Sequence, residues 1–122
     1  MISCVIVDDD KNIRDVFTDI LELLGLKVIA KGNDGNEAVH LYSEHKPDLL
    51  FIDINMPKYD GFYAIKKIRE FEPNAKIVVV TADFTQETQN KLEELGTTAV
   101  IYKPFDQLQI KRILLEEYKI KT

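Results

Sequence analysis

Several residues in the sequence carry side chains that bind metals or phosphoryl groups, and most of them directly follow a short apolar run. They are Asp8, Asp9, Asp10, Asp53, Asn55, Thr81 and Lys103. Two carboxylates about 4 Å apart repel each other by about 4 kcal/mol at an effective dielectric constant of about 20, and a divalent cation such as Mg²⁺ relieves that repulsion. Lysine and hydroxyl groups bind phosphate, and an aspartate can attack phosphorus as a nucleophile. Brought together, these side chains would suit metal-dependent phosphoryl transfer.

Five short apolar runs, most of them rich in β-branched residues, are spaced along the chain. They comprise residues 2–7, 27–30, 49–52, 77–80 and 99–102. Nearly continuous apolar runs of this length are typical of strands buried on both faces, as in a parallel sheet. We therefore predict five parallel strands.

Helical patterns follow these runs. After the first run, apolar residues at helical spacing form a stripe that Gly25 ends; they are Ile13, Val16, Phe17, Ile20, Leu21 and Leu24. Asp34 and Glu37 resemble a capping box that opens a second helix. A third helix carries an apolar face, a fourth is a polar segment over residues 85–95, and Asp106 caps a fifth. The predicted inward residues of the third and fifth helices are Phe62, Ile65, Ile68, Ile110, Ile113, Leu114 and Tyr118.

Five repeats of strand and helix predict an α/β fold in which helices cover both faces of a parallel sheet. Such sheets bind ligands beyond the carboxyl ends of their strands. The residues Asp8–Asp10, Asp53, Thr81 and Lys103 follow four of the five predicted strands, so we expect them at one edge of the sheet. The run at 27–30 lacks such a residue, which suits an edge strand. The aspartate triplet also suits helix N-caps, and the sequence leaves that interpretation open.

The composition is that of an ordinary globular domain. The 122 residues suit one domain, 1–122, with 45% hydrophobic and 30% charged residues. The net charge of −5 argues against a protein that binds nucleic acid or anionic lipid through a basic face. The N-terminus turns acidic too early for a secretory signal, and no apolar stretch approaches a membrane span of about 20 residues. With a single cysteine, Cys4, a reducing cytoplasmic setting is expected.

The motifs at the predicted strand ends resemble those of response-regulator receiver domains of two-component systems, of the single-domain, CheY-like type. The matching segments are Val7-Asp8-Asp9, Asp53-Ile54-Asn55-Met56-Pro57, Asp60-Gly61, Thr81-Ala82 and Lys103-Pro104-Phe105. Each motif alone is weak, but the ordered set is specific, and the resemblance covers essentially the whole chain. It implies a doubly wound, flavodoxin-like (βα)5 fold with the strand order 2-1-3-4-5.

The resemblance implies a metal site of four residues. Asp9 resembles a direct metal ligand, Asp8 a ligand that acts mainly through water, and Asn55 the residue whose backbone carbonyl binds the metal. Asp53 completes the set. The implied cofactor is Mg²⁺, with Mn²⁺ as an alternative, since both ions prefer oxygen ligands.

Three residues are implied to act on the phosphoryl group. Asp53 resembles the phosphoacceptor, Thr81 the hydroxyl that binds a phosphoryl oxygen, and Lys103 the lysine that pairs with the acceptor and then with the phosphoryl group. The bond between Lys103 and Pro104 resembles one that is cis in the family, which an X–Pro bond permits. Receivers catalyse only their own phosphorylation and dephosphorylation, so we expect a signalling protein rather than an enzyme.

The resemblance also implies two kinds of protein partner. A sensor histidine kinase or a phosphotransfer protein supplies the phosphoryl group, and a target protein binds a surface made by the fourth helix, fifth strand and fifth helix, which changes on phosphorylation. Direct contact with nucleic acid or a membrane is not expected, and the chain is expected to be a monomer or weak homodimer. Because no output-domain pattern follows the fifth helix, we expect output through protein binding or phosphoryl relay.

One position departs from the family pattern. Three residues before the lysine the family has an aromatic switch residue, but this chain has Val100. Tyr102 lies two residues further on and therefore on the same face of the strand. We hypothesise that Tyr102 couples Thr81 to the output surface, although packing alone would also account for it. Asn55 and Asp83 occupy positions that tune phosphoryl lifetime in the family, and they predict fairly fast self-dephosphorylation.

Three other interpretations stay open. A HAD-type phosphohydrolase would use Asp8 as the nucleophile, with Asp10 two residues on, but it would leave Asp53 without a role. The identity of the phosphorylated aspartate separates the two interpretations. A receiver-shaped interaction module that is never phosphorylated would keep the fold without the reaction. Flavodoxin-like FMN binding is disfavoured, because the acidic triplet stands where a Ser/Thr/Gly phosphate loop is needed.

Overall fold

The computed structural model describes residues 1–97 and 99–122, over which strands and helices alternate. The strands are β1 (Ser3–Val7), β2 (Lys27–Gly32), β3 (Leu49–Ile52), β4 (Ile77–Thr81) and β5 (Ala99–Tyr102). The helices are α1 (Lys11–Leu23), α2 (Gly35–His45), α3 (Gly61–Phe71), α4 (Gln86–Glu94) and α5 (Gln107–Tyr118). Among the residues described, none of the helices combines the length and the apolar character that crossing a membrane requires.

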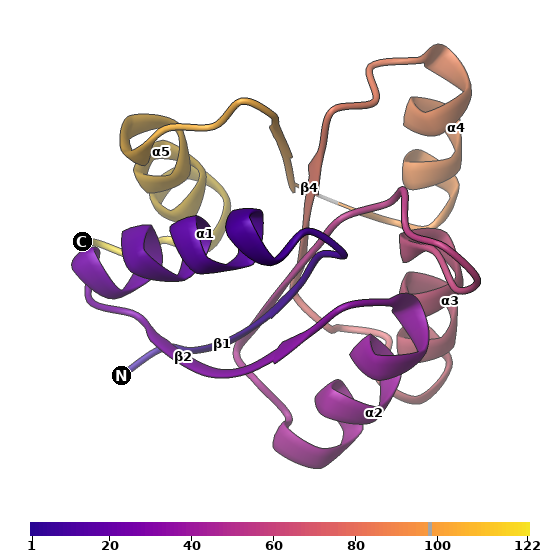
Figure 1. Ribbon diagram of the computed structural model, residues 1–122, viewed down its shortest axis with the longest axis horizontal. Helices are drawn as coiled ribbons and strands as arrows, with labels where there is room; N and C mark the ends of the chain where they lie inside the picture. Colours follow the sequence, from indigo (N-terminus) through magenta and orange to yellow (C-terminus); the bar gives the residue numbers. More distant parts are fainter. Residues whose placement is uncertain (98) are drawn as a thin grey trace.

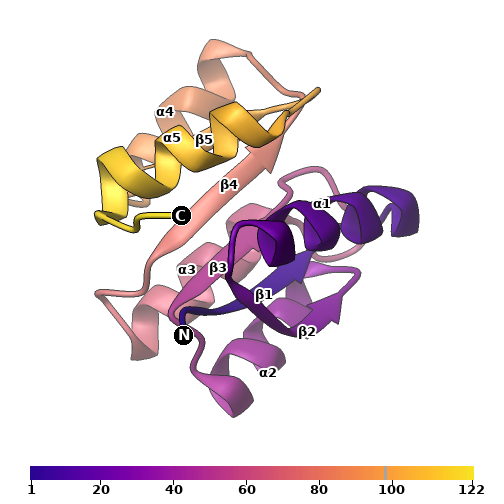
Figure 2. The same ribbon diagram turned by 90° about the vertical axis from the view of Figure 1, so that its left-hand side faces the viewer.

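The strands form one parallel sheet in the order β2-β1-β3-β4-β5 (Figures 1 and 2). The central strands β3 and β4 are buried along their whole length, and β1 is buried from Cys4 onward. The edge strands β2 and β5 are only partly buried. The predicted fold class and strand order are therefore confirmed, as is the edge position of the strand that lacks a polar residue at its end.

Helices cover both faces of the sheet, with α1 and α5 on one face and α2, α3 and α4 on the other (Figures 1 and 2). The core accordingly divides into two apolar clusters. Alternate residues of β1 contribute to each: Val5 and Val7 pack towards α2 and α3, whereas Cys4 and Ile6 pack towards α1 and α5. Two-residue periodicity thus distributes one nearly continuous apolar run over both faces of the sheet.

The structure corrects several details of the predicted elements. β1 begins at Ser3 rather than at residue 2, and β2 and β4 continue to Gly32 and Thr81. Val16 was predicted to lie on the buried face of α1 but is 51% exposed, because the apolar stripe is wider than the face that packs on the sheet. The polar helix α4 buries only Thr88 and Leu92, in keeping with its composition.

Each helix begins at a side chain that accepts hydrogen bonds from the first turn. The N-cap residues are Asp10, Asp34, Asp60, Thr85 and Asp106. Asp10 accepts from the backbone N–H groups of Asn12 and Ile13 at 2.9 and 3.3 Å. The N-cap interpretation of the aspartate triplet is therefore correct for Asp10 alone.

The thiol of Cys4 is fully buried in β1, and burial, together with the negative charge of Asp48, raises its pKa to about 12. We expect the native protein to resist iodoacetamide at about pH 9, where an exposed cysteine is largely thiolate. The same thiol should react rapidly in urea. Intact mass spectrometry measures the alkylated fraction, and rapid alkylation of the folded chain would contradict the burial of Cys4.

Candidate functional site

The carboxyl ends of four strands bring the predicted site residues to one edge of the sheet. Asp8 follows β1, Asp53 follows β3, Thr81 ends β4 and Lys103 follows β5. Backbone hydrogen bonds continue the sheet past the strand ends: the N–H of Asp53 donates to the carbonyl of Val7 at 3.0 Å, and that of Lys103 donates to the carbonyl of Thr81 at 2.9 Å. The site residues are thus held by the sheet itself.

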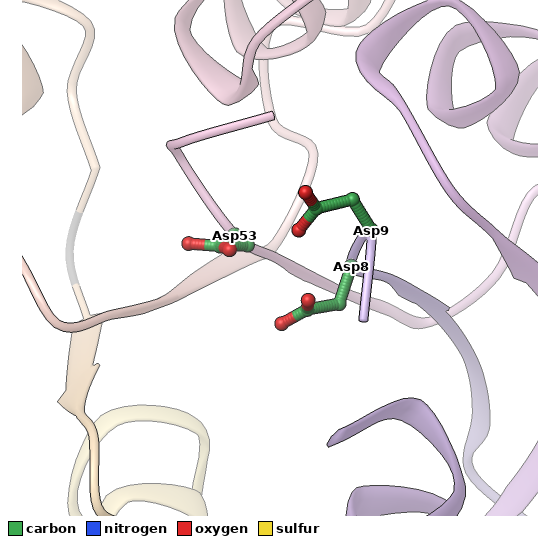
Figure 3. Close-up of side chains that lie close together, drawn as sticks. All are labelled: Asp8, Asp9 and Asp53. Atoms are coloured by element: carbon green, nitrogen blue, oxygen red, sulfur yellow. The ribbon is translucent and has the colours of Figure 1, made fainter. Parts of the chain in front are cut away.

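Three carboxylates meet at this edge. One oxygen from each of Asp8, Asp9 and Asp53 lies within 4.8 Å of the others, and Figure 3 shows Asp8 and Asp9 side by side at the end of β1, next to Asp53. Asp8 and Asp53 are buried, with 3% and 6% of their surface exposed, whereas Asp9 is exposed. A group of oxygen ligands that is open on one side suits a hard divalent cation that keeps some of its water.

Lys103 provides the cation that faces these carboxylates. Its Nζ donates to Asp8 Oδ2 at 2.8 Å and to Asp53 Oδ2 at 3.2 Å. Burial alone would lower the pKa of Lys103, but the hydrogen bond to Asp8 and the negative charges of Asp53 and Asp8 raise it on balance. Lys103 therefore stays protonated and offsets part of the carboxylate repulsion.

Both carboxylate oxygens of Asp53 accept a hydrogen bond. Its Oδ1 accepts the backbone N–H of Ile54 at 2.7 Å, while Oδ2 faces Lys103. Burial raises the pKa of Asp53, the charge of Lys103 opposes that rise, and the charge of Asp8 adds to it, so the pKa is raised overall. Additional positive charge, as from a bound cation, would favour its ionised, nucleophilic form.

Sequence reasoning missed the role of Arg14. Its guanidinium donates to the backbone carbonyl of Asp8 at 2.6 Å, and Asp8 Oδ1 accepts the N–H of Asp10 at 2.9 Å. Together these bonds fix both the backbone and the side chain of Asp8. The only available signal was that Arg14 lies one helical turn after the N-cap Asp10, a spacing that fits many surface arginines equally well.

The loop after β3 carries the remaining predicted residues. Asn55 lies exposed in the turn after Asp53. Gly61 opens α3 against the backbone: its N–H donates to the carbonyl of Ile54 at 2.9 Å, and an added Cβ would lie 2.4 Å from the carbonyl oxygen of Asp53. Only glycine permits this approach, which explains the Asp60-Gly61 motif.

Thr81 and Asp83 occupy the start of the loop from β4 to α4. Thr81 is fully buried, and its Oγ1 accepts the N–H of Asp83 at 3.1 Å. The Asp83 carboxylate faces α4, where it accepts the N–H of Thr85 at 2.9 Å and the hydroxyl of Thr88 at 2.7 Å. These bonds, that from Thr88 foremost, lower the pKa of Asp83. Asp83 thus contacts α4 rather than the three carboxylates.

Tyr102 pairs with Thr81 in the register of β4 and β5, and Val100 pairs with Val79. The two β5 residues are both partly buried, which confirms that they share a face of the strand. The ring of Tyr102 stacks on Phe84 with 4.7 Å between centroids and 24° between planes, and Phe84 is 60% exposed. Sequence reasoning did not identify Phe84. The Lys103–Pro104 bond is cis, as the resemblance implied.

Comparisons with known proteins agree with this architecture. The family described as the response regulator receiver domain matches residues 4–115. The chain is 37% identical over 110 residues to the chemotaxis protein CheY of Thermotoga maritima, covering 90% of this chain and 92% of that protein. It is equally identical to CheY of Bacillus subtilis, covering 90% and 89%.

Among solved structures, this chain is similar to one in the CheX–CheY–BeF3–Mg²⁺ complex from Borrelia burgdorferi. The TM-score is 0.91, the identity is 28%, and the match covers 96% of this chain and 89% of that one. The CheY4 chemotaxis protein of Vibrio cholerae matches with a TM-score of 0.87 and 27% identity, over 93% and 96%.

Replacing Lys103 tests the charge balance of the site. We expect Lys103→Met to lower the free energy of unfolding by about 3 kcal/mol in EDTA, at the lower end for breaking a buried ion pair because Lys103 is partly exposed. A divalent cation should stabilise this variant more than the wild type, since it replaces the missing positive charge. Urea titrations with EDTA or Mg²⁺ measure both effects, with Lys111→Met on the exposed side of α5 as the control. Equal cation effects in all three proteins would contradict this account.

Proposed function

The chain belongs to the response-regulator receiver family, and from this premise we propose that it is a phosphoacceptor switch that takes a phosphoryl group onto Asp53. As a CheY-like receiver domain it is part of a two-component response regulator. One observation carries the assignment of Asp53: a single lysine, Lys103, donates to both Asp8 and Asp53 where Asp9 also converges. That set supplies the nucleophile and positive charge that phosphoryl transfer needs, together with a metal-binding carboxylate group.

We propose Mg²⁺, or Mn²⁺ in its place, as the cofactor. Asp9 and Asp53 would bind the ion directly, Asp8 mainly through water, and Asn55 through its backbone carbonyl. The donor set supports this choice, because it consists of carboxylate oxygens within 4.8 Å of one another and an exposed side that leaves room for water. When bound, the ion neutralises charge on the phosphoryl oxygens.

The residues of the chain then perform the transfer. The ionised Asp53 carboxylate attacks phosphorus, the new O–P bond forms as the N–P bond of a phosphohistidine breaks, and the released imidazole takes up a proton. The Thr81 hydroxyl donates to a phosphoryl oxygen, and Lys103 pairs with the group after releasing Asp53. With a small acyl phosphate the bond that breaks is O–P, and a carboxylate leaves.

Dephosphorylation reverses the modification without another enzyme. Water attacks phosphorus, the O–P bond to Asp53 breaks, and inorganic phosphate leaves. We propose that this occurs fairly fast, because Asn55 and Asp83 occupy the two positions that tune phosphoryl lifetime in the family. The chain would thus catalyse only its own phosphorylation and dephosphorylation.

Its partners follow from the same role. A sensor histidine kinase or phosphotransfer protein would supply the phosphoryl group, and a target protein would bind the α4–β5–α5 surface in a cytoplasmic setting. A related CheY was solved in a complex with CheX. Exposed Leu108 and Leu115 support binding at this surface, since they offer apolar area on α5.

Phosphorylation by acetyl phosphate tests the acceptor. With Mg²⁺, intact mass spectrometry should detect one phosphoryl adduct on the wild type and none on Asp53→Asn. The matched control is Asp10→Asn, which keeps an N-cap side chain on α1 and should accept the group normally. Without divalent cation, little adduct should form on any of the three proteins.

Each alternative outcome of this experiment has a distinct meaning. If Asp53→Asn still forms an adduct and Asp8→Asn forms none, the result would favour Asp8 as the nucleophile, as in the HAD-type phosphohydrolase interpretation. No adduct on the wild type would favour an interaction module that is never phosphorylated. After removal of the donor, an adduct that persisted for hours would contradict fast self-dephosphorylation.

Tyr102 is proposed to couple Thr81 to the output surface, which its pairing with Thr81 and its stacking on Phe84 support. Tyr102→Phe keeps the stacked ring, whereas Tyr102→Ala removes it and with it about 1 kcal/mol of stabilisation from the aromatic pair. We expect the phosphorylation-dependent NMR shift of the Phe84 amide to persist in Tyr102→Phe and to diminish in Tyr102→Ala. Val100→Ala, on the same face of β5, is the control. Wild-type shifts in Tyr102→Ala would reduce Tyr102 to a packing residue.

A further inference from the structure

Asp83 connects the buried hydroxyl of Thr81 to the first turn of α4 through consecutive hydrogen bonds. Its backbone N–H donates to Thr81 Oγ1 at 3.1 Å. Its carboxylate accepts the N–H of Thr85 at 2.9 Å through one oxygen and the hydroxyl of Thr88 at 2.7 Å through the other. Thr85 closes the set, because its own hydroxyl accepts the N–H of Thr88 at 3.2 Å. We call these four residues the Asp83 latch.

The latch constrains how the Thr81 hydroxyl can act. A threonine hydroxyl has one donor and two acceptor positions. Because the N–H of Asp83 occupies one acceptor position of Thr81 Oγ1, the O–H of Thr81 points away from that N–H and can donate to another group. The loop therefore orients the proton of Thr81, and any displacement of Thr81 Oγ1 acts on the backbone of Asp83.

The other end of the latch lies on a weakly held helix. α4 buries only Thr88 and Leu92, and Thr88, 6% exposed, is one of the two residues that the latch holds there. Figure 1 shows α4 at the far end of the loop that leaves β4. Elements with few buried contacts are the ones that move at low energetic cost, so a displacement passed through Asp83 reaches a helix that can respond.

We propose that Asp83 is a positioning residue: its backbone N–H orients the Thr81 hydroxyl, and its carboxylate transmits the position of that hydroxyl to the first turn of α4. This inference rests on the proposed phosphorylation of Asp53 and adds the route by which the modification reaches α4. It also assigns the side chain of Asp83 a role in coupling rather than in contact with the phosphoryl group.

Variants at Thr88 cut the latch at a site remote from the chemistry. Thr88→Val removes the hydroxyl and keeps the shape, whereas Thr88→Ser keeps the hydroxyl. Asp83→Ala removes the acceptor of both the Thr88 hydroxyl and the Thr85 N–H, so Asp83→Ala combined with Thr88→Val should have no larger effect than Asp83→Ala alone. The matched control is Asn90→Ala, which removes the exposed bond from Gln86 Nε2 to Asn90 Oδ1, 2.8 Å long, within the same helix.

The readout is hydrogen–deuterium exchange of the first turn of α4, with and without beryllium fluoride and Mg²⁺ as a stable phosphoryl mimic. In the wild type we expect the exchange rate to change by about fivefold or more on addition of the mimic. That ratio should fall towards one in Thr88→Val and Asp83→Ala and keep its wild-type value in Thr88→Ser and Asn90→Ala. A merely structural role would change the exchange rates of both states equally and leave the ratio intact.

Two failures can be told apart by recording the acetyl phosphate adduct of every variant. If all the proteins form the adduct and Thr88→Val and Asp83→Ala keep the wild-type ratio, the latch is wrong and the proposed function stands. A ratio of exchange rates close to one in Asn90→Ala as well would also contradict the latch, because any weakening of α4 would then be enough to abolish the response to the mimic. Absence of an adduct on the wild type would overturn the proposed function and this inference together.

Discussion

Like charges forced together by the backbone are the constraint around which this receiver is organised. Asp8 and Asp53 are both buried, and Asp9 joins them within 4.8 Å. Without compensation such a group would be unstable, so the surrounding structure supplies donors and positive charge: Lys103 from β5, the N–H of Ile54 and the N–H of Asp10. This arrangement leaves the site anionic and open on one side, which is where a cation and a phosphoryl group are proposed to bind.

The sheet makes that arrangement possible. Because its strands are parallel and adjacent, β1 and β3 end side by side, and the central position of both lets helices exclude water from either face. Gly61 brings the start of α3 against the carbonyl of Asp53, so the loop that carries the acceptor is packed rather than free. The proposed chemistry therefore lies at the ends of the strands, while the response is proposed to lie on α4, the helix with the fewest apolar residues.

Much of this could be predicted from the sequence, for physical reasons. Strand ends are marked by the switch from apolar to polar residues, so Asp53, Thr81 and Lys103 were placed correctly by topology alone. The resemblance then supplied their expected roles, which stay predictions. Arg14, Phe84 and the bonds of Asp83 to α4 could not be predicted, because they depend on side-chain rotamers and loop geometry that leave no periodic signal. The prediction that Val16 is buried was wrong for a related reason. Periodicity shows that a helix has an apolar face, but not how wide a face the neighbouring elements can cover.

The buried acidic site opposes the fold that contains it. In the unfolded chain Asp8 and Asp53 are separated by 45 residues and barely repel each other. Their repulsion therefore raises the free energy of the native state alone. Neutralising one of these aspartates would relieve this repulsion and add thermodynamic stability, while removing a group that the proposed reaction needs. At this edge of the sheet, the same carboxylates therefore lower the free energy of unfolding and serve the proposed phosphoryl transfer. A variant of this domain selected for stability alone would lose them and would be inactive.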